Sequence, residues 1–321
     1  MKKKILITGC AGFIGSQFAL RSLKKYDVIG IDNFDNYYSV SFKKKRVSIL
    51  QKKKNFKFYK VDIRDFARLN NVIKKYKINY VFHFAAQAGV RYSKINPEKY
   101  TTTNIIGTIN LLNSLKSKKV DKIFLSSSSS VYGENKKFPL NEKEKLSPIN
   151  HYAFTKQVNE LTGEIFSKNY NQRIYMLRFF TVYGKWGRPD MFFFKLFKSV
   201  FEKKYFKLNN NGNHDRDFTH IDDVCEILIK LMNQKINRKF GVFNICSNNP
   251  VNIKKIINYL KKKVNVKLKI KNTSRNKLDV KKTHGSNIKV LNLVGSKKFK
   301  RYEESIKDIF DWYKSNKIYK F

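Results

Sequence analysis

The sequence has little cysteine and little histidine. Three cysteines occur among 321 residues, and Cys10, Cys225 and Cys246 are too scattered for a disulfide framework or a cysteine-based metal site. The five histidines have no ligand spacing relative to them. We therefore expect no bound metal, and we expect the chain to work in a reducing compartment, the cytoplasm.

Long apolar runs are absent as well. No stretch approaches the length that a transmembrane helix needs. The lysines at 2–4 and the apolar residues at 5–7 resemble the start of a signal peptide, but this apolar stretch is much shorter than the hydrophobic region of such a peptide. We expect no membrane insertion. No internal repeat is visible either.

Acidic residues are scarce relative to basic ones, with 24 Asp and Glu against 68 Lys and Arg and a net charge of +44. Clustered basic residues would favour nucleic acid as a partner. Here the lysines are spread along the whole chain, and no DNA- or RNA-binding module is recognisable. We interpret the charge as compositional, expect no nucleic-acid partner, and note that such a field would attract an anionic substrate.

The first motif with chemical content is a glycine turn after a short apolar run. Gly9, Gly12 and Gly15 follow the run at 5–7 and lead into an apolar helical stretch, as in loops that bring backbone against a pyrophosphate. A second apolar run ends in Asp32, 17 residues after Gly15. An acidic side chain at this distance binds a ribose hydroxyl and disfavours a 2′-phosphate, so the sequence predicts NAD rather than NADP.

The chain then alternates strands and helices. Strands are expected at 56–61, 80–86 and 122–125, and helices lie between them, which favours an α/β fold with a doubly wound parallel (Rossmann) sheet. Asp62 and Ile63 follow one strand, where an adenine ring can be held. Ala85 and Ala86 end the next strand, where small residues let backbone approach a dinucleotide. His83 inside that strand is expected to be a packed core residue.

A catalytic group is predicted from the middle of the chain. Five serines at 126–130 follow a buried strand directly, at the edge where open α/β sheets bind ligands. Tyr152 and Lys156 are four residues apart on a helix expected at 152–167, so they project from one face. A cation near a phenol favours its phenolate and moves its pKa toward that of a working base.

Taken together, these motifs resemble the extended short-chain dehydrogenases/reductases and, among them, the UDP-glucuronate 4-epimerases. The glycine and Tyr-Lys motifs specify only the superfamily, whereas the stretches from Ala85 and from Leu177 are much narrower. The residues that carry the resemblance are GCAGFIG (9–15), DNFDNYYSVSFKKKR (32–46), AAQAGVRYS (85–93), SSSSVYG (127–133), YAFTK (152–156), LRFFTVYGKWGRPDM (177–191), RDFTHIDD (216–223) and FNICSNNPV (243–251).

The resemblance implies an epimerase that holds NAD tightly and passes through a transient 4-keto sugar. By analogy, Tyr152 takes the proton of the sugar 4-hydroxyl, and Ser128 binds the 4-oxygen with help from Ser129. Lys156 would lower the pKa of Tyr152 and bind the nicotinamide ribose. Together with the glycines, Tyr152 and Lys156, the implied cofactor contacts are Phe13, Ile14, Asp32, Asn33, Asp62, Ile63, Ala85, Ala86 and Asn104.

The resemblance also distinguishes substrates. Related dehydratases carry Asp-Glu before the Val-Tyr-Gly turn, where this chain has Ser129 and Ser130. Arg188 matches the family's position for binding a sugar carboxylate, with Arg91 and Thr181 nearby. Arg216 matches the arginine that binds the UDP phosphates. The chain departs from the family's pattern at 277–279 and 284–286, in the distal nucleotide pocket.

These observations predict an NAD-binding Rossmann domain at 1–180, to which 218–248 returns, and a smaller mixed α/β domain at 181–321 for the nucleotide sugar. The resemblance implies a homodimer built through a helix pair. Two alternatives stay open. One is a UDP-glucose/UDP-galactose 4-epimerase. The other is a non-catalytic NAD-binding regulator, against which the intact set of Ser128, Tyr152 and Lys156 speaks.

Overall fold

A seven-stranded parallel sheet forms the centre of the larger lobe. The structure is a computed structural model that describes residues 2–276 and 278–321. The strand order is β10-β6-β5-β4-β1-β2-β3, and every neighbouring pair is parallel. This confirms the predicted doubly wound sheet. The strands are β1 (Lys4–Thr8), β2 (Asp27–Asp32), β3 (Phe56–Lys60), β4 (Tyr80–His83), β5 (Lys122–Ser128), β6 (Ile174–Phe179) and β10 (Phe240–Ile245).

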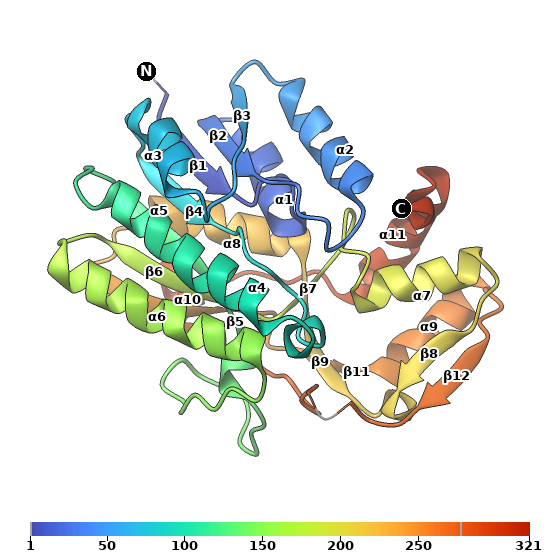
Figure 1. The fold of residues 1–321 in the computed structure, drawn as a ribbon. Helices are drawn as coiled ribbons and strands as arrows, with labels where there is room; N and C mark the ends of the chain where they lie inside the picture. The colour runs from blue at the N-terminus through green and yellow to red at the C-terminus, as the bar shows by residue number, and fades with distance from the viewer. Residues whose placement is uncertain (1, 277) are drawn as a thin grey trace.

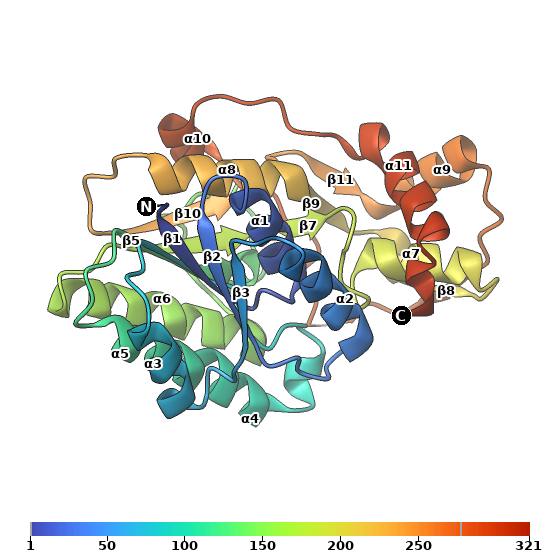
Figure 2. The same cartoon turned by 90° about the horizontal axis from the view of Figure 1, so that it is seen from above.

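Helices cover both faces of this sheet, so its strands are apolar on both sides. Ile5 and Ile7 of β1 enter the core on one face, and Leu6 enters the core on the other. Figure 2 shows the two helix layers on opposite sides of the sheet. One layer holds α1 (Phe13–Ser22), α8 (Ile221–Asn233) and α10 (Ile288–Val294), with α2 (Val40–Gln51) beside α1; the other holds α3 (Phe66–Lys74), α4 (Pro97–Tyr100), the π-helical η2 (Thr101–Ile106), α5 (Gly107–Leu115) and α6 (His151–Asn169).

A smaller mixed α/β lobe, at the right of Figure 1, is built mainly from the second half of the chain. Its aromatic core includes Phe194, Phe197 and Tyr313. Two small sheets belong to it, one with the order β11-β9-β7 and one that pairs β12 with β8. Its elements are β7 (Thr181–Tyr183), α7 (Phe192–Phe201), β8 (Phe206–Asn209), β9 (Asp215–His220), β11 (Pro250–Asn252), α9 (Ile253–Val264), β12 (Ile270–Thr273) and α11 (Tyr302–Ser315), with single 3₁₀ turns at η4 (Asn210–Gly212) and η5 (Ile318–Lys320).

Several predicted boundaries shift. β4 ends at His83 rather than at residue 86, and the backbone of Phe84 and Ala85 after it packs closely against Gly9. β5 includes the serines through Ser128, so they end the strand rather than follow it. The predicted return of 218–248 to the Rossmann domain does not begin with β9, because β9 pairs with β7 and β11 of the smaller lobe.

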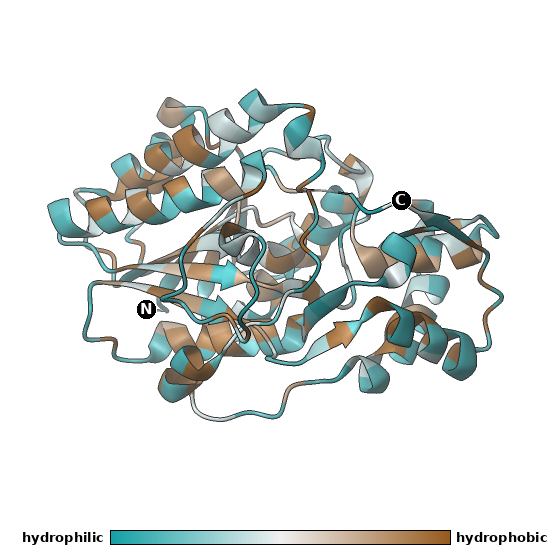
Figure 3. Ribbon diagram, turned by 90° about the horizontal axis from the view of Figure 1, so that it is seen from below, coloured by the Kyte–Doolittle hydropathy of each residue, from teal (hydrophilic) through white to brown (hydrophobic). Residues whose placement is uncertain are grey.

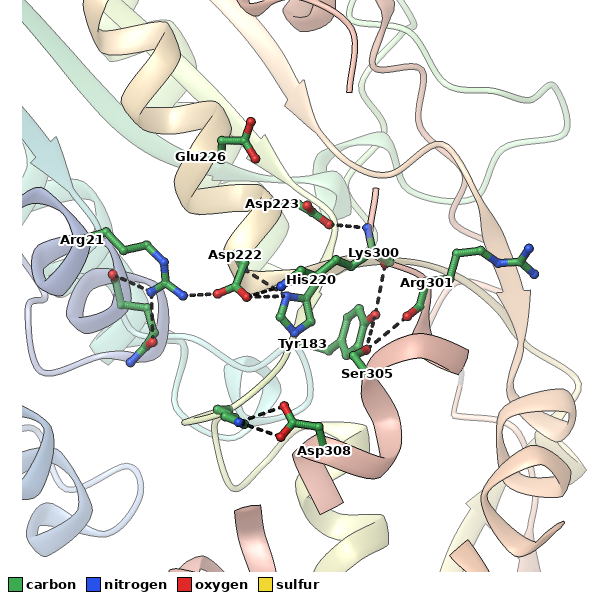
Figure 4. A network of polar contacts seen from close by, with 12 residues as sticks. Arg21, Tyr183, His220, Asp222, Asp223, Glu226, Lys300, Arg301, Ser305 and Asp308 are labelled. Carbon is green, nitrogen blue, oxygen red and sulfur yellow. Dashed lines mark hydrogen bonds and ion pairs between the residues drawn. The ribbon is translucent and has the colours of Figure 1, made fainter. Parts of the chain in front are cut away.

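A network of ion pairs joins the last helix to the sheet layer (Figure 4). Asp222 at the start of α8 pairs with Arg21 of α1, and it accepts from Lys300 Nζ at 2.7 Å. Asp308 of α11, drawn below Asp222 in Figure 4, pairs with Lys185 at 2.8 Å. The side chain of His220 accepts a hydrogen bond from the backbone amide of Asp222 and caps α8.

The helices that flank the sheet are amphipathic, and Figure 3 shows them banded in polar and apolar colours. Within the part of the chain that the structure describes, no helix combines the length and the apolar character needed to cross a membrane. Cys10, Cys225 and Cys246 are buried free thiols.

Candidate active site

Two cavities that share lining residues lie at the carboxyl ends of the central strands, where the strand order reverses and open α/β sheets bind ligands, and a third cavity adjoins them. The central cavity, of about 210 Å³, contains Tyr152 and Ser128. The inner cavity, of about 90 Å³, contains Asp32 and shares Gly9 with the central one. The outer cavity, of about 610 Å³, faces the smaller lobe and shares Arg188 with the central one.

The glycine turn forms the floor between the inner and central cavities. Gly9 has a φ of +73°, and a Cβ there would lie 2.5 Å from the amide nitrogen of Ala85. A Cβ on Gly15 would lie 2.2 Å from the carbonyl oxygen of Gly9. Gly12 precedes α1 without a side-chain cap, so the first amides of the helix are free to bind an anion. This cradle fits a dinucleotide pyrophosphate.

Asp32 lies where the sequence predicted an acidic residue for a ribose. Its carboxylate accepts from the amide of Ala11 at 3.0 Å and from the amide of Phe34 at 2.9 Å. Burial raises the pKa of Asp32, although these amides and the charge of Lys43 oppose the shift. Lys43 lines the same cavity, and sequence reasoning missed it.

The other predicted cofactor residues fall into two groups. Phe13 and Ile14 line the central cavity, Asn33, Ile63 and Ala85 line the inner one, and Ala86 lines both. Two residues act through their neighbours. Asp62 accepts from the amide group of Asn33 at 2.8 Å, and buried Asn104 accepts from the backbone amide of Gln87 in the cavity wall at 2.7 Å.

The structure brings Tyr152, Lys156 and Ser128 to the central cavity. Asn150 caps α6, so Tyr152 stands in the first turn and Lys156 one turn later on the same face. Ser128 ends β5, and its hydroxyl donates to the hydroxyl of Ser130 at 3.0 Å. Ser129 begins η3 (Ser129–Tyr132) and lines none of these three cavities.

The pKa of Tyr152 depends on burial and on its neighbours in the cavity. Burial raises the pKa of Tyr152, while the charge of Arg188 and the hydroxyl of Ser128 lower it. The Lys156 ammonium lies 5.9 Å from the Tyr152 ring centroid and donates to the Ser126 carbonyl at 2.8 Å. Lys156 is not among the main causes of the shift, so its role in lowering the pKa of Tyr152 stays a prediction.

Lys156 is also perturbed. Burial lowers the pKa of Lys156 to about 8, although the charge of Glu160 opposes the shift. Glu160 stands one turn further along α6 and forms a buried pair with Arg178 at 2.7 Å, and it accepts from the hydroxyl of Ser127 at 2.5 Å. This pair fixes the serine strand against α6. Sequence reasoning missed it because the partners come from separate elements.

Arg188 stands on the wall between the central and outer cavities. Its Nε and Nη2 donate to the two carboxylate oxygens of Asp190 at 2.9 and 2.8 Å. Burial opposes the charge of Arg188, but Asp190 outweighs burial and raises the pKa of Arg188 further above its ordinary value. The sequence did not anticipate this internal partner.

The remaining predicted substrate residues line the outer cavity. Arg216 donates to the carbonyl oxygens of Asp215, Val280 and Lys281 at 2.6–3.0 Å, and burial lowers its pKa. Arg91 pairs with Asp279 at 2.6 Å, and Thr181 lies on the same wall. Two arginines in a wide cavity suit an anionic ligand such as a diphosphate.

Two further residues of the site were missed, Tyr37 and Lys195. Tyr37 belongs to the loop 33–38 that follows β2, and it lines both the central and outer cavities. Lys195 lines the outer cavity from α7. Among the residues that the structure describes, no group of three His, Cys, Asp or Glu side chains is placed to hold a metal ion.

Comparison with known proteins gives the same family as the motifs. A family model described as GDP-mannose 4,6 dehydratase matches residues 6–315. The chain is 37% identical to a UDP-glucuronate 4-epimerase of Thermodesulfobacterium geofontis, over 97% of this chain and 96% of the relative.

Solved structures of similar fold agree. The UDP-glucuronic acid 4-epimerase of Bacillus cereus, in complex with UDP-glucuronic acid and NAD, superposes with a TM-score of 0.93 at 32% identity, covering 98% of this chain and 99% of that one. The UDP-glucose 4-epimerase of Thermotoga maritima, with UDP-glucose, superposes with a TM-score of 0.88 at 28% identity, covering 98% and 99%. The chain therefore belongs to the extended short-chain dehydrogenases/reductases, in the family described by the GDP-mannose 4,6 dehydratase model.

Proposed function

We propose that the chain interconverts UDP-glucuronate and UDP-galacturonate by NAD-dependent 4-epimerisation through a transient 4-keto sugar. The observation that carries this proposal is the arrangement at the central cavity. Tyr152 and Ser128 line it together with the glycine cradle, and Arg188 stands on the wall that leads to the outer cavity. A base, a dinucleotide cradle and a guanidinium therefore surround one volume.

Whichever sugar it prefers, the chain is a nucleotide-sugar 4-epimerase, an isomerase that uses NAD. Its similarity to 4-epimerases runs nearly end to end in both sequence and fold. The name of the family model describes dehydratases, which eliminate water with an adjacent Asp-Glu pair. Here Ser129 and Ser130 occupy those positions, and hydroxyls cannot serve as that acid/base pair.

The residues that would hold NAD are those of the cradle and the inner cavity. The free amides at the start of α1 bind the pyrophosphate, and Asp32 accepts from a ribose hydroxyl. When bound, NAD supplies the acceptor for the hydrogen that leaves the sugar C4 with its electron pair.

The protein's own part in oxidation is to take the hydroxyl proton. Tyr152 accepts the proton of the sugar 4-hydroxyl, and Ser128 holds the 4-oxygen by a hydrogen bond. Because burial raises the pKa of Tyr152, the phenolate needs positive charge nearby. Arg188 supplies part of it from the cavity wall, and the charge of its partner Asp190 opposes this effect by a smaller amount. In the reverse half-reaction, Tyr152 returns the proton to the new hydroxyl.

Epimerisation also requires that the keto sugar presents its other face. The outer cavity is about three times as large as the central one, at about 610 against 210 Å³. Arg216 and Arg91 can hold the diphosphate there while the sugar turns in the central cavity. Arg188 then orients the sugar carboxylate through charge-assisted hydrogen bonds.

One observation favours the neutral-sugar alternative. Asp190 already neutralises Arg188, so the pair offers hydrogen-bond donors without net charge. A UDP-glucose 6-hydroxyl could accept from the same donors. The UDP-glucose/UDP-galactose reading therefore has to be excluded by experiment.

The experiment is an incubation of purified protein with UDP-glucuronate and, separately, with UDP-glucose, followed by NMR of the C4 configuration. The proposal expects UDP-galacturonate from the first sugar and at most slow conversion of the second. Preferential conversion of UDP-glucose supports the alternative. Conversion of neither sugar, with NAD retained, supports the non-catalytic regulator.

We also propose that two copies associate through α6. Phe154, Leu161 and Ile165 lie on one stripe of this helix and are 46–56% exposed, beside exposed Ile106 at the end of η2. Light scattering should give twice the chain mass for the wild type, and Leu161→Asp should shift it toward the monomer. A monomeric wild type contradicts the dimer.

The cytoplasmic location stays a prediction, which the buried free thiols support.

A further inference from the structure

One of the two hydrogen-bonding edges of the Arg188 guanidinium is already taken by Asp190. Its side-on edge, formed by Nε and Nη2, donates to both oxygens of Asp190 at 2.9 and 2.8 Å. Arg188 lines the central and outer cavities, whereas Asp190 lines only the outer one. Within the described part of the chain, Nη1 makes no hydrogen bond, so the end-on edge formed by Nη1 and Nη2 stays available.

Asp190 is in turn held from a second side. The hydroxyl of Tyr37 donates to Oδ2 of Asp190 at 3.2 Å. Tyr37 is packed so closely that a Cβ on Gly89 would lie 2.1 Å from this hydroxyl. Burial raises the pKa of Asp190, but the charge and hydrogen bonds of Arg188 outweigh burial, and the net shift is downward.

An incoming carboxylate therefore does not displace Asp190. Displacement would leave a carboxylate that is only 22% exposed without its guanidinium, and an uncompensated charge in such a place is costly. We propose that Asp190 is a positioning residue, which fixes the plane of Arg188 and confines the substrate carboxylate to the end-on edge. This inference rests on the proposed function.

Fixing Arg188 would protect the keto intermediate from losing CO₂. A 4-keto uronate is a β-keto acid, and it loses CO₂ when its C5–C6 bond aligns with the carbonyl π system. In that step the C5–C6 bond breaks, its electron pair enters the C4 carbonyl to give an enolate, and CO₂ leaves. The enolate then takes at C5 the proton that Tyr152 accepted. A fixed Arg188 holds the carboxyl group in one position relative to the sugar ring, so the ring cannot change its conformation to bring the C5–C6 bond into this alignment.

The test compares Asp190→Asn, Tyr37→Phe and the wild type on UDP-glucuronate. In Asp190→Asn one carboxylate oxygen becomes an NH₂ group that faces an Arg188 donor, so the guanidinium must rotate. We expect kcat to fall roughly tenfold or more, with little change in KM, and a UDP-4-keto-pentose, the pentose product of this decarboxylation, to appear by NMR. Tyr37→Phe should act in the same direction to a smaller extent. Glu303→Gln, which breaks an exposed pair of the same spacing with Arg301, is the matched control and should behave as the wild type.

The outcomes separate the two claims. If the wild type epimerises UDP-glucuronate and Asp190→Asn matches its kcat without pentose, the role of Asp190 is refuted alone. If the wild type does not act on UDP-glucuronate, the proposed function is refuted and this inference falls with it. If Asp190→Asn does not fold, Tyr37→Phe decides: pentose formation supports the inference, and wild-type products overturn it.

Discussion

Replacing Arg188 by alanine perturbs two things that can be measured separately. The first is stability, because the change leaves Asp190 without its cation. The two side chains are 26% and 22% exposed, between the surface and the core. Exposed pairs contribute about 0–1 kcal/mol and breaking buried ones costs about 3–5, so we expect a loss of roughly 2–3 kcal/mol. The double variant Arg188→Ala/Asp190→Ala also removes the carboxylate that has lost its partner, so it should regain part of the lost stability.

The second effect is on the substrate. Truncating one partner of a desolvated charged hydrogen bond costs roughly 2–5 kcal/mol. At 1.36 kcal/mol per factor of ten, kcat/KM for UDP-glucuronate should fall by roughly 30-fold to several thousand-fold. UDP-glucose has no carboxylate, so its kcat/KM should fall less, only by the amount that follows from the lost effect of Arg188 on the pKa of Tyr152. The bound NAD content should not change, because Arg188 is not part of the glycine cradle.

The assay is steady-state conversion of both sugars, read by NMR, with NAD content and melting temperature determined on the same samples. The double variant separates the two effects, because it should recover stability without recovering activity on UDP-glucuronate. Equal slowing of both sugars, or recovery of UDP-glucuronate activity in the double variant, would show that Arg188 does not bind the sugar carboxylate.

The remaining predictions concern the base, the cofactor and acid stability. Tyr152→Phe should lower turnover by at least roughly 10²–10⁴ while NAD released on denaturation stays constant, and a near-normal rate would refute the base. Asp32→Ala should relax discrimination against NADP in titrations, because Lys43 lines the same cavity, and an unchanged preference would contradict this role. Burial lowers the pKa of His83 from 6.5 to about 3, so below pH 6.5 the unfolded chain binds a proton that the folded chain does not. Stability should therefore fall by roughly 2 kcal/mol between pH 6.5 and 5, and melts of His83→Asn should be flatter there; an equal slope would contradict the assignment.

The parallel sheet was predictable because its strands are covered on both faces. β1, β4 and β6 therefore read as continuous apolar runs, and helices at regular spacing fix the topology. The place of β9 was not predictable from the sequence. Its pattern was expected to belong to the main sheet, yet β9 is buried between two short strands of the smaller lobe.

The positions of Tyr152, Lys156 and Ser128 were predictable from local rules. One helical turn separates the first two, and the third ends a strand at the edge where ligands bind. The pKa of Tyr152 was not predictable in this way, because it depends on burial and on Arg188, which comes from a distant loop. The order of charged residues along the chain does not show which groups are buried, so it does not predict how far burial shifts a pKa.

The partner of Arg188 was also hidden, although Asp190 is only two residues away. Whether two side chains at that spacing meet depends on the loop between β7 and α7. Gly184 and Trp186 there have φ values of +139° and +66°, a conformation that no periodic pattern encodes. Lys195 comes from α7 and Tyr37 from the loop after β2, so their place in the site also depends on tertiary packing between separate elements.

The central claim is that the hydrogen at C4 leaves the sugar and returns to the same carbon without net oxidation. The direct measurement is incubation of the wild type with UDP-glucuronate deuterated at C4, in ordinary water, followed by NMR and mass analysis of the product. The account predicts UDP-galacturonate that keeps the deuterium at C4. Loss of the label to water, or recovery of UDP-glucuronate alone after prolonged incubation, would contradict it.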